Sequence, residues 1–234
     1  MTSDERRAQL RSNLDVLERR LVASCAAAGR PRDDITLIAI TKTFPAEDIR
    51  LLADLGVRDI GENRDQEAWA KVRALAGVDV HWHFVGRLQA NKCRSVAGYA
   101  DVVHSVDRDR LVDALAAGAA AAGRRLEVFV QVSLDDEPRR GGAPPEDVRR
   151  LADRVAAAEH LHLVGVMAIA PPEADAAAAF ARLGDVGAAV RASHPAATAI
   201  SAGMSGDLEA AISAGATHVR IGTALLGGRP PTVR

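Results

Sequence analysis

A lysine follows an apolar, strand-like run near the start of the chain. The run Ile35–Thr41 is rich in β-branched and aliphatic residues, and Pro45 prevents the strand from continuing far beyond Thr43. Lys42 therefore lies at the carboxyl end of a buried strand, where its ammonium is poorly solvated. A desolvated lysine can lose its proton and form an imine, which an arginine cannot do. The alternative is a structural lysine whose charged end reaches solvent.

The lysine content of the chain makes Lys42 more noticeable. The sequence has thirty Lys and Arg residues, and its lysines are Lys42, Lys71 and Lys92. An arginine-rich chain has thus kept a lysine on a strand that does not favour a charge. This bias supports an imine-forming role for Lys42.

Two segments late in the chain have the composition of an anion-binding site. Ser201-Ala202-Gly203-Met204-Ser205 and Ile221-Gly222-Thr223-Ala224 each lead from a strand-like run into a helix-like run. Glycines allow close approach of the backbone, and hydroxyls add hydrogen-bond donors for a phosphate. The alternative is that Ser205 and Thr223 only cap helices. Two such segments after consecutive strands favour the anion site.

Arg220 lies two residues before Gly222, on the same face of the last strand. A guanidinium inside a sheet or barrel needs an acceptor, because an unpaired buried charge is costly. A ring nitrogen of a cofactor is one candidate acceptor, and a carboxylate on a neighbouring strand is the other. A phosphate site, an imine-forming lysine and such an arginine together indicate pyridoxal phosphate.

The elements that position these residues alternate regularly along the chain. A helix over 4–28 precedes eight strand-helix units, which predicts parallel strands joined by right-handed crossovers. We expect one (β/α)₈ TIM barrel of the α/β class over residues 1–234, with an extra N-terminal helix. An open doubly wound sheet is the alternative, but no strand leads into a G-x-G-x-x-G turn. The expected strands are 35–41, 57–60, 80–86, 101–104, 126–132, 160–167, 197–201 and 218–221. Asp107 is expected to cap the helix after the fourth strand.

Composition narrows the class of protein. The net charge of -1 and the lack of long basic runs argue against nucleic acid or a membrane surface as a partner. Cys25 and Cys93 are too few for a disulfide framework. The charged start of the chain lacks a signal-peptide core, and no apolar run approaches the ~20 residues of a membrane span. We therefore expect a cytoplasmic protein.

The histidines do not predict a metal site. His81 and His83 point to one face of the third strand, but no third ligand is evident. His83 is instead a candidate to pack near the cofactor ring. Asn63, at the exit of the second strand, and Met204 are further candidates for cofactor contact.

At several of these positions the chain resembles a known family. The blocks Ile40-Thr41-Lys42-Thr43, Ile60-Gly61-Glu62-Asn63, Trp82-His83-Phe84-Val85-Gly86-Arg87, Gly203-Met204-Ser205 and Val219-Arg220-Ile221-Gly222-Thr223 look like those of the pyridoxal-phosphate homeostasis proteins. This family has a single barrel similar to the amino-terminal domain of alanine racemase. The resemblance covers nearly the whole chain.

The resemblance implies that Lys42 carries pyridoxal 5'-phosphate as an internal aldimine in vitamin B6 homeostasis, without vigorous catalysis. It implies phosphate contacts from Ser205, Gly222 and Thr223, and a ring-nitrogen contact from Arg220. The expected cofactor-binding set is Lys42, Asn63, His83, Met204, Ser205, Arg220, Gly222 and Thr223, with no catalytic residue and no metal.

Two other functions remain open at this stage. A racemase needs acid-base groups on both sides of the substrate, and the one tyrosine of the chain is Tyr99. A Schiff-base aldolase could bind a phosphorylated metabolite in the same loops. The expected partners are pyridoxal phosphate and its apo-enzymes, and the expected assembly is a monomer.

Overall fold

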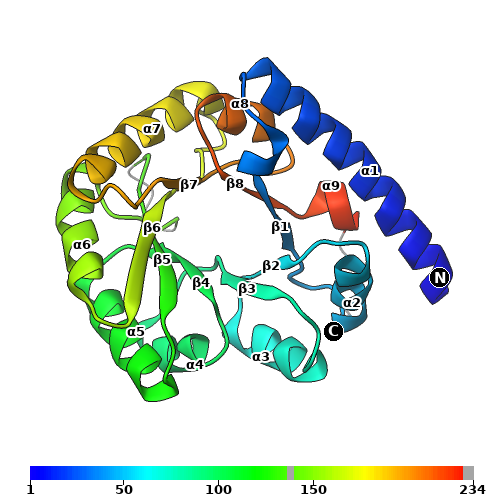
Figure 1. Ribbon diagram of the computed structural model, residues 1–234, viewed down its shortest axis with the longest axis horizontal. Helices are drawn as coiled ribbons and strands as arrows, with labels where there is room; N and C mark the ends of the chain where they lie inside the picture. Colours follow the sequence, from blue (N-terminus) through cyan, green and yellow to red (C-terminus); the bar gives the residue numbers. More distant parts are fainter. Residues whose placement is uncertain (136–139, 229–234) are drawn as a thin grey trace.

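The computed structural model describes residues 1–135 and 140–228, and shows a closed barrel of parallel strands surrounded by helices (Figure 1). Each strand pairs with the next, and β8 pairs with β1 to close the barrel. The predicted TIM barrel is confirmed, and the open sheet is wrong. The strands are β1 Thr36–Ile40, β2 Asp59–Glu62, β3 His81–Phe84, β4 Val102–Val106, β5 Leu126–Gln131, β6 Leu161–Met167, β7 Ala199–Ser201 and β8 His218–Ile221.

Helices connect successive strands and cover the outside of the barrel (Figure 1). Short 3₁₀ turns, Arg32–Asp34 and Ala90–Lys92, precede β1 and α4. The helices are α1 Ser3–Ala27, α2 Ala46–Asp54, α3 Asp65–Ala74, α4 Cys93–Ala97, α5 Asp109–Ala122, α6 Pro145–Ala157, α7 Ala176–Ser193, α8 Leu208–Ser213 and α9 Thr223–Leu226. None of the helices in the described segments is both long and apolar enough to cross a membrane.

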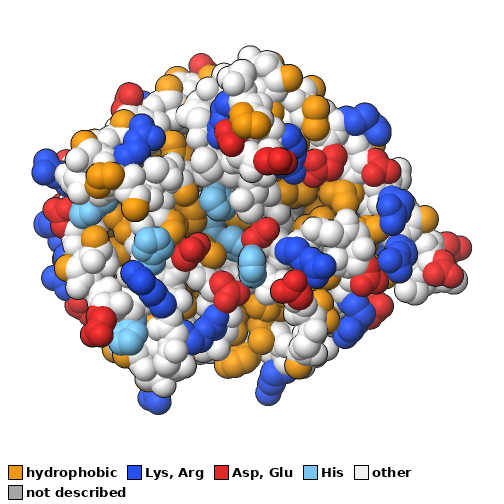
Figure 2. All heavy atoms as spheres, viewed as in Figure 1, with side chains coloured by type: hydrophobic (Ala, Val, Ile, Leu, Met, Phe, Trp, Pro, Cys, Tyr) orange, Lys and Arg blue, Asp and Glu red, His pale blue; other side chains and the backbone are white. Residues whose placement is uncertain are grey.

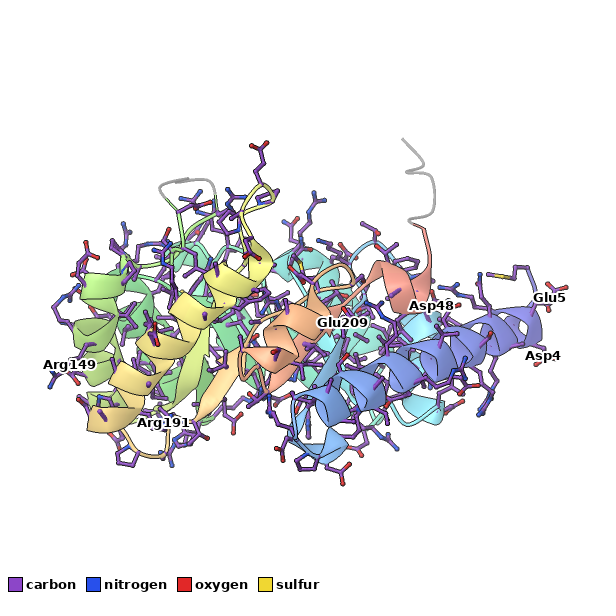
Figure 3. The ribbon with its side chains drawn as sticks, turned by 90° about the horizontal axis from the view of Figure 1, so that it is seen from above. Asp4, Glu5, Asp48, Arg149, Arg191 and Glu209 are labelled. Carbon is purple, nitrogen blue, oxygen red and sulfur yellow. The ribbon has the colours of Figure 1, made fainter. Side chains whose placement is uncertain are left out.

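The extra N-terminal helix lies along the outside of the barrel. Figure 3 shows α1 running past Glu209 of α8 and Asp48 of α2. Arg20 forms an ion pair with Glu209 at 2.8 Å, and Arg6 forms one with Asp48 at 2.7 Å. Arg6 also donates to the carbonyl of Leu226 in α9. The helix α1 therefore bridges the first and last units of the barrel.

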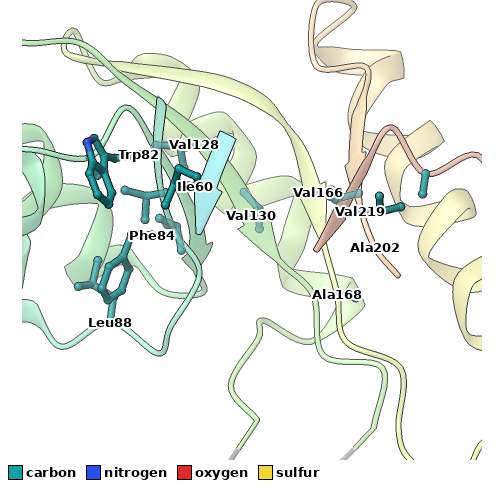
Figure 4. Close-up of a cluster of buried hydrophobic side chains, with 14 of the residues drawn as sticks. Ile60, Trp82, Phe84, Leu88, Val128, Val130, Val166, Ala168, Ala202 and Val219 are labelled. Atoms are coloured by element: carbon teal, nitrogen blue, oxygen red, sulfur yellow. The ribbon is translucent and has the colours of Figure 1, made fainter. Parts of the chain in front are cut away.

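The main apolar core lies between the barrel and the helices. Along β3, Trp82 and Phe84 point outward into this core, whereas His83 points inward (Figure 4). Val128 and Val130 of β5 show the same outward alternation. A smaller cluster around Val102, Phe129 and Met167 fills the interior of the barrel. The strand period of two thus separates an apolar outer layer from a mixed interior.

Two of the predicted local features differ from the structure. The second strand was expected to stop before Gly61, but β2 continues to Glu62. A side chain at Gly61 would come within 2.5 Å of the Ile40 side chain, so glycine lets the two strands continue side by side. Asp107, expected to cap α5, instead accepts a hydrogen bond from the backbone N–H of Gly142 at 3.2 Å.

The interior of the barrel contains histidines that burial keeps neutral. His218 packs edge-on against Phe129, with ring centroids 5.2 Å apart. Burial is the main cause that lowers the pKa of His218 from 6.5 to about 4. The pKa of the fully buried His104 is also lowered, mainly by burial. Both rings therefore favour the folded state only while they are unprotonated.

We predict that His218→Gln reduces the loss of stability on acidification. Between pH 6.5 and about 4 the unfolded chain takes up a proton at His218 that the folded protein excludes, so the free energy of unfolding falls as pH falls. The His218 contribution to that fall is on the order of 3 kcal/mol. Urea unfolding at pH 7, 5.5 and 4 measures it. His194→Gln, outside the interior, is the control; equal slopes for His218→Gln and the unchanged protein would contradict the prediction.

Candidate cofactor-binding site

A cavity of about 270 Å³ opens at the carboxyl ends of β1 and β8. It brings together six of the eight predicted contact residues from opposite ends of the chain. The residues that line it are Ile40, Lys42, Phe44, Met204, Ser205, Gly206, Arg220, Gly222, Thr223 and Gly227. An amine, a guanidinium, two hydroxyls and glycine backbone therefore face one small space.

Lys42 lies in a tight turn just beyond β1. The turn is closed by a hydrogen bond from the Phe44 N–H to the Thr41 carbonyl at 3.0 Å. Thr43 adopts a left-handed backbone conformation with φ of 69°, which costs energy for a β-branched residue. Such a conformation persists only where the surroundings determine it. The half-buried side chain of Lys42 then points into the cavity rather than continuing the strand.

A buried cluster around Lys71 holds this turn. The Lys71 Nζ donates to the Thr41 carbonyl at 2.8 Å and forms ion pairs with Glu62 at 2.6 Å and Glu67 at 2.7 Å. Glu62 also accepts the Thr41 hydroxyl at 2.5 Å, and Glu67 accepts the Thr43 N–H at 2.5 Å. Both residues flanking Lys42 are therefore fixed by the same cluster.

The two carboxylates of the cluster differ in their environment. Burial raises the pKa of Glu62, although Lys71 works in the opposite direction. Burial also opposes the charge on Glu67, but hydrogen bonds from Lys71 and from the Thr43 N–H hold its pKa below 4.5. The ionised form of Glu67 is therefore favoured, and it accepts the N–H of Thr43, the turn residue with the left-handed backbone. The sequence signal for this cluster was the i, i+4 spacing of Glu67 and Lys71 on α3, together with the scarcity of lysines.

The loops after β7 and β8 are joined by Ser205. Its Oγ accepts a hydrogen bond from the Ala224 N–H at 3.2 Å, and Ser205 does not cap α8, which was the alternative considered from the sequence. Asp207 precedes α8 instead, and its carboxylate accepts from the Met204 N–H at 2.5 Å. Thr223 also makes no capping bond, because Gly222 precedes α9. The two loops thus form one unit at the cavity.

Gly203 shapes the first of these loops. Its φ of 92° is strained for any residue with a side chain, and a Cβ would lie 2.7 Å from the Cβ of Ala211. Its carbonyl accepts from the Arg220 N–H at 2.9 Å. This glycine therefore lets the loop turn sharply while staying paired with β8.

Arg220 is buried at the floor of the cavity, with 5% of its surface exposed. Its guanidinium donates to the Ser201 hydroxyl at 2.7 Å and to the Ala168 carbonyl at 2.9 Å. These neutral acceptors take the place of the carboxylate considered from the sequence. Burial lowers its pKa to about 10, so it remains a cation at neutral pH. A cation held by neutral groups favours an electron-rich acceptor from a ligand.

The two other predicted residues lie outside this cavity. Asn63 lines a separate cavity of about 800 Å³ with Arg64, Arg87, Lys92 and Arg108. His83 is buried in the barrel interior, where it contacts Asp59 and His104. Among the described residues, no group of three or more His, Cys, Asp or Glu side chains is arranged to hold a metal ion.

The fold agrees with comparisons to known proteins. Residues 7–230 match the family described as alanine racemase, N-terminal domain, which makes the protein a barrel of that class. It is 46% identical over 244 residues to the pyridoxal phosphate homeostasis protein of Mycobacterium tuberculosis (strain ATCC 25618 / H37Rv), with 96% of this chain and 95% of that one covered. Identity to the Escherichia coli (strain K12) protein of the same name is 38% over 223 residues, covering 93% and 95%. The chain belongs to the pyridoxal phosphate homeostasis protein family.

Solved structures show the same relationship. PipY of Synechococcus elongatus PCC7942, solved with PLP bound, is 34% identical with a TM-score of 0.79, and covers 88% of this chain and all (100%) of that one. Alanine racemase of Streptomyces coelicolor A3(2) is 20% identical with a TM-score of 0.75. The match covers 94% of this chain but only 58% of that racemase, so the likeness concerns the barrel fold alone.

We predict that Lys71→Met destabilises the protein by about 3–5 kcal/mol, because it leaves the buried Glu62 carboxylate without its cation. The turn around Lys42 should exchange its amide hydrogens faster than in the unchanged protein. Lys92→Met is the control, since Lys92 is more exposed and lies 3.6 Å from Asp65. Chemical denaturation and hydrogen exchange measure the two effects. Equal stability of the two variants would show that the cluster does not hold the turn.

Proposed function

We propose that this protein binds pyridoxal 5'-phosphate at Lys42 and acts in intracellular vitamin B6 homeostasis. The observation that carries the proposal is that one cavity joins Lys42 to the paired loops at Ser205 and Gly222. Bound pyridoxal phosphate supplies an aldehyde that condenses with a lysine amine and loses water. The chain supplies the amine, the anion-binding backbone and the fixed cation around that aldehyde.

The residues of the cavity divide into three roles. Ser205, Gly222 and Thr223 hold the phosphate, because loops after the seventh and eighth strands of such barrels commonly do so. Arg220 would donate to the ring nitrogen, and Met204, which is 39% exposed, would contact the cofactor from the lining of the cavity. The cavity volume of about 270 Å³ lies near the lower end of small-molecule pockets, roughly 300 Å³, which suits a compact phosphorylated ring.

Tyr99 argues against a racemase as the main activity. Racemisation needs a second acid-base group opposite Lys42. Tyr99 is buried against Trp69, with ring centroids 5.3 Å apart, and is not among the residues that line the cavity. Burial raises its pKa far above the ordinary value. We therefore propose a carrier role, with transfer to apo-enzymes by a monomeric, cytoplasmic protein.

An aldolase acting on a phosphorylated metabolite would use Lys42 and the same loops. It would leave Arg220 without a ring nitrogen to contact, so the buried cation at the cavity floor favours the pyridine cofactor. The visible absorption of the protein after incubation with pyridoxal phosphate separates the two functions. A colourless protein would contradict the proposal.

We predict that Lys42→Ala abolishes covalent attachment of pyridoxal phosphate. Borohydride reduction followed by peptide mass analysis should find the cofactor on Lys42 in the unchanged protein and nowhere in the variant. Lys92→Ala is the matched control and should keep full labelling. Labelling that persists on Lys71 or Lys92 in the Lys42→Ala protein would show that the site is assigned to the wrong lysine.

We also predict negligible conversion of L-alanine to D-alanine by the cofactor-loaded protein. The physical reason is that Tyr99 does not line the cavity and so offers no proton donor opposite Lys42. Chiral chromatography of the reaction mixture gives the measurement. Turnover faster than about 1 s⁻¹, the low end of ordinary enzyme rates, would make the protein a racemase.

A further inference from the structure

Inside the barrel, polar side chains are joined by hydrogen bonds into a chain, although filling the interior does not require polar groups. We call this series of side chains the hydrogen-bond chain. Barrel interiors of this type are usually filled by branched apolar side chains. Here His83, His104, Ser201 and Arg220 lie inside, each with 5% or less of its surface exposed. Phe129 stacks on His104 with ring centroids 4.4 Å apart, so the ring is held flat in an otherwise apolar layer. Buried polar groups are costly unless every member is paired, which points to a role in the site.

The four hydrogen bonds of the chain cross the barrel from β2 to β8. Asp59 Oδ1 lies 3.0 Å from His83 Nε2, and His83 Nδ1 lies 2.9 Å from His104 Nε2. His104 Nδ1 lies 3.0 Å from the Ser201 Oγ, which lies 2.7 Å from the Arg220 guanidinium. Every ring nitrogen of the two histidines thus has one partner within the chain.

The hydrogen-bond chain begins with Asp59, at the opposite end of the barrel from the cavity. Asp59 is the first residue of β2, and its side chain is 25% exposed. Figure 2 shows the face at the amino ends of the strands, where histidine and acidic side chains gather around a central hollow. Arg220, at the other end, lines the cavity that contains Lys42. The chain therefore connects a solvent-accessible carboxylate to the floor of the cofactor site.

Asp59 and Arg220, the two ends of the hydrogen-bond chain, set the direction of the hydrogen bonds between them. An ionised carboxylate only accepts, so a neutral His83 carries its proton on Nε2 and accepts through Nδ1. His104 must then donate through Nε2 and accept through Nδ1, which requires the Ser201 O–H to point at His104. The Ser201 oxygen is left with its lone pairs toward Arg220, which only donates. One tautomer of each ring satisfies all five groups.

The electrostatics agree with this direction. Burial opposes the charge of Asp59, but the hydrogen bond from His83 holds the pKa of this carboxyl below its ordinary value. Burial, reinforced by the charge of Arg220, lowers the pKa of His104, so that ring is neutral. A neutral His104 with Nε2 protonated has a free lone pair only at Nδ1, where it faces Ser201.

We propose that Asp59, His83, His104 and Ser201 are positioning residues that form a one-way hydrogen-bond chain and orient the Arg220 guanidinium toward the cavity. Two of the N–H groups of Arg220 are fixed by Ser201 and Ala168, which sets the plane of the guanidinium and the direction of its remaining N–H groups. The ligand that meets these groups is an aromatic ring with an acceptor nitrogen. The identity of this ligand rests on the proposed function, whereas the hydrogen-bond chain does not.

The first test uses the cofactor-free protein. Nitrogen-15 spectra of labelled histidine side chains at neutral pH should show His83 and His104 as neutral rings with the proton on Nε2. Resonances are assigned by single His→Gln variants. A proton on Nδ1 of His104, or a doubly protonated His104, would overturn the proposal. His194, which pairs with Asp153 at 2.7 Å outside the barrel interior, provides the reference signal.

Asp59→Ala tests the end of the chain that reaches solvent. Without its carboxylate, His83 should become a mixture of tautomers, and the His104 Nε2–H signal should shift in response. Because Asp59 is partly exposed, this variant is expected to fold. An unchanged His104 signal in a folded Asp59→Ala protein would show that the groups are not coupled.

Ser201→Ala tests the effect on the cavity. It should weaken pyridoxal phosphate binding about tenfold, the effect of one hydrogen bond to a charged group. Ser105→Ala is the matched control: Ser105 is also buried in a strand, but its hydroxyl has no hydrogen-bond partner among the described residues. Equal affinities of the two folded variants would overturn the positioning role. If the unchanged protein binds no pyridoxal phosphate, the proposed function fails, and the tautomer spectra still decide whether the chain exists.

Discussion

The pairing of β1 with β8 is the contact on which the site depends. Ile38 lies opposite Arg220 in this pairing, so the residues after β1 and the residues after β8 meet at the same end of the barrel. Closure of the barrel thereby converts a sequence separation of nearly the whole chain into direct proximity. Lys42 can face Gly222 and Thr223 only because this last pair of strands forms. The loop after β7 adds Met204 and Ser205 to the same cavity.

Two buried networks then refine the positions of the two basic residues at the cavity, Lys42 and Arg220. The Lys71 cluster fixes the backbone on both sides of Lys42, and the interior histidines contact Arg220 through Ser201. Both networks pair nearly all of their polar atoms, which is the condition under which burial of such groups is tolerated. The Oε2 of Glu62 is an exception, since it is buried without a partner in the described part of the chain. The site is therefore built from fixed groups rather than from mobile surface side chains.

The sequence was sufficient to predict the barrel and most of the cavity. Lys42, Ser205, Arg220 and Gly222 could be found because strand ends in a parallel barrel share one face, so chain order alone groups them. The Ser205–Ala224 bond could not be predicted, because it joins two loops whose approach depends on the path of each backbone. A serine before a helix predicts a cap from the sequence, whether it caps that helix or bonds to another loop.

Other differences follow from packing between distant strands. The end of β2 depends on the room that Gly61 leaves for Ile40, which a strand pattern within one segment does not contain. His83 was assigned to the cofactor set because of its strand and family context, and that contact stays a prediction. In the structure the His83 ring lies inside the barrel, next to His104, and does not line the cavity that contains Lys42. Alternation predicts the face of a side chain, but the layer it occupies depends on strand stagger.

The contacts of α1 have a consequence for the order of folding during synthesis. This first helix packs on α9, where Arg6 and Asn13 donate to the carbonyls of Leu226 and Leu225. Helix α1 is therefore synthesised long before α9, and its apolar face waits for that helix to be covered. Contacts of such long sequence separation slow folding and leave apolar surface exposed meanwhile. The loop at Gly222, which lines the same cavity as Lys42, is made similarly late, so a chain shortened before β8 would lack one wall of the cavity.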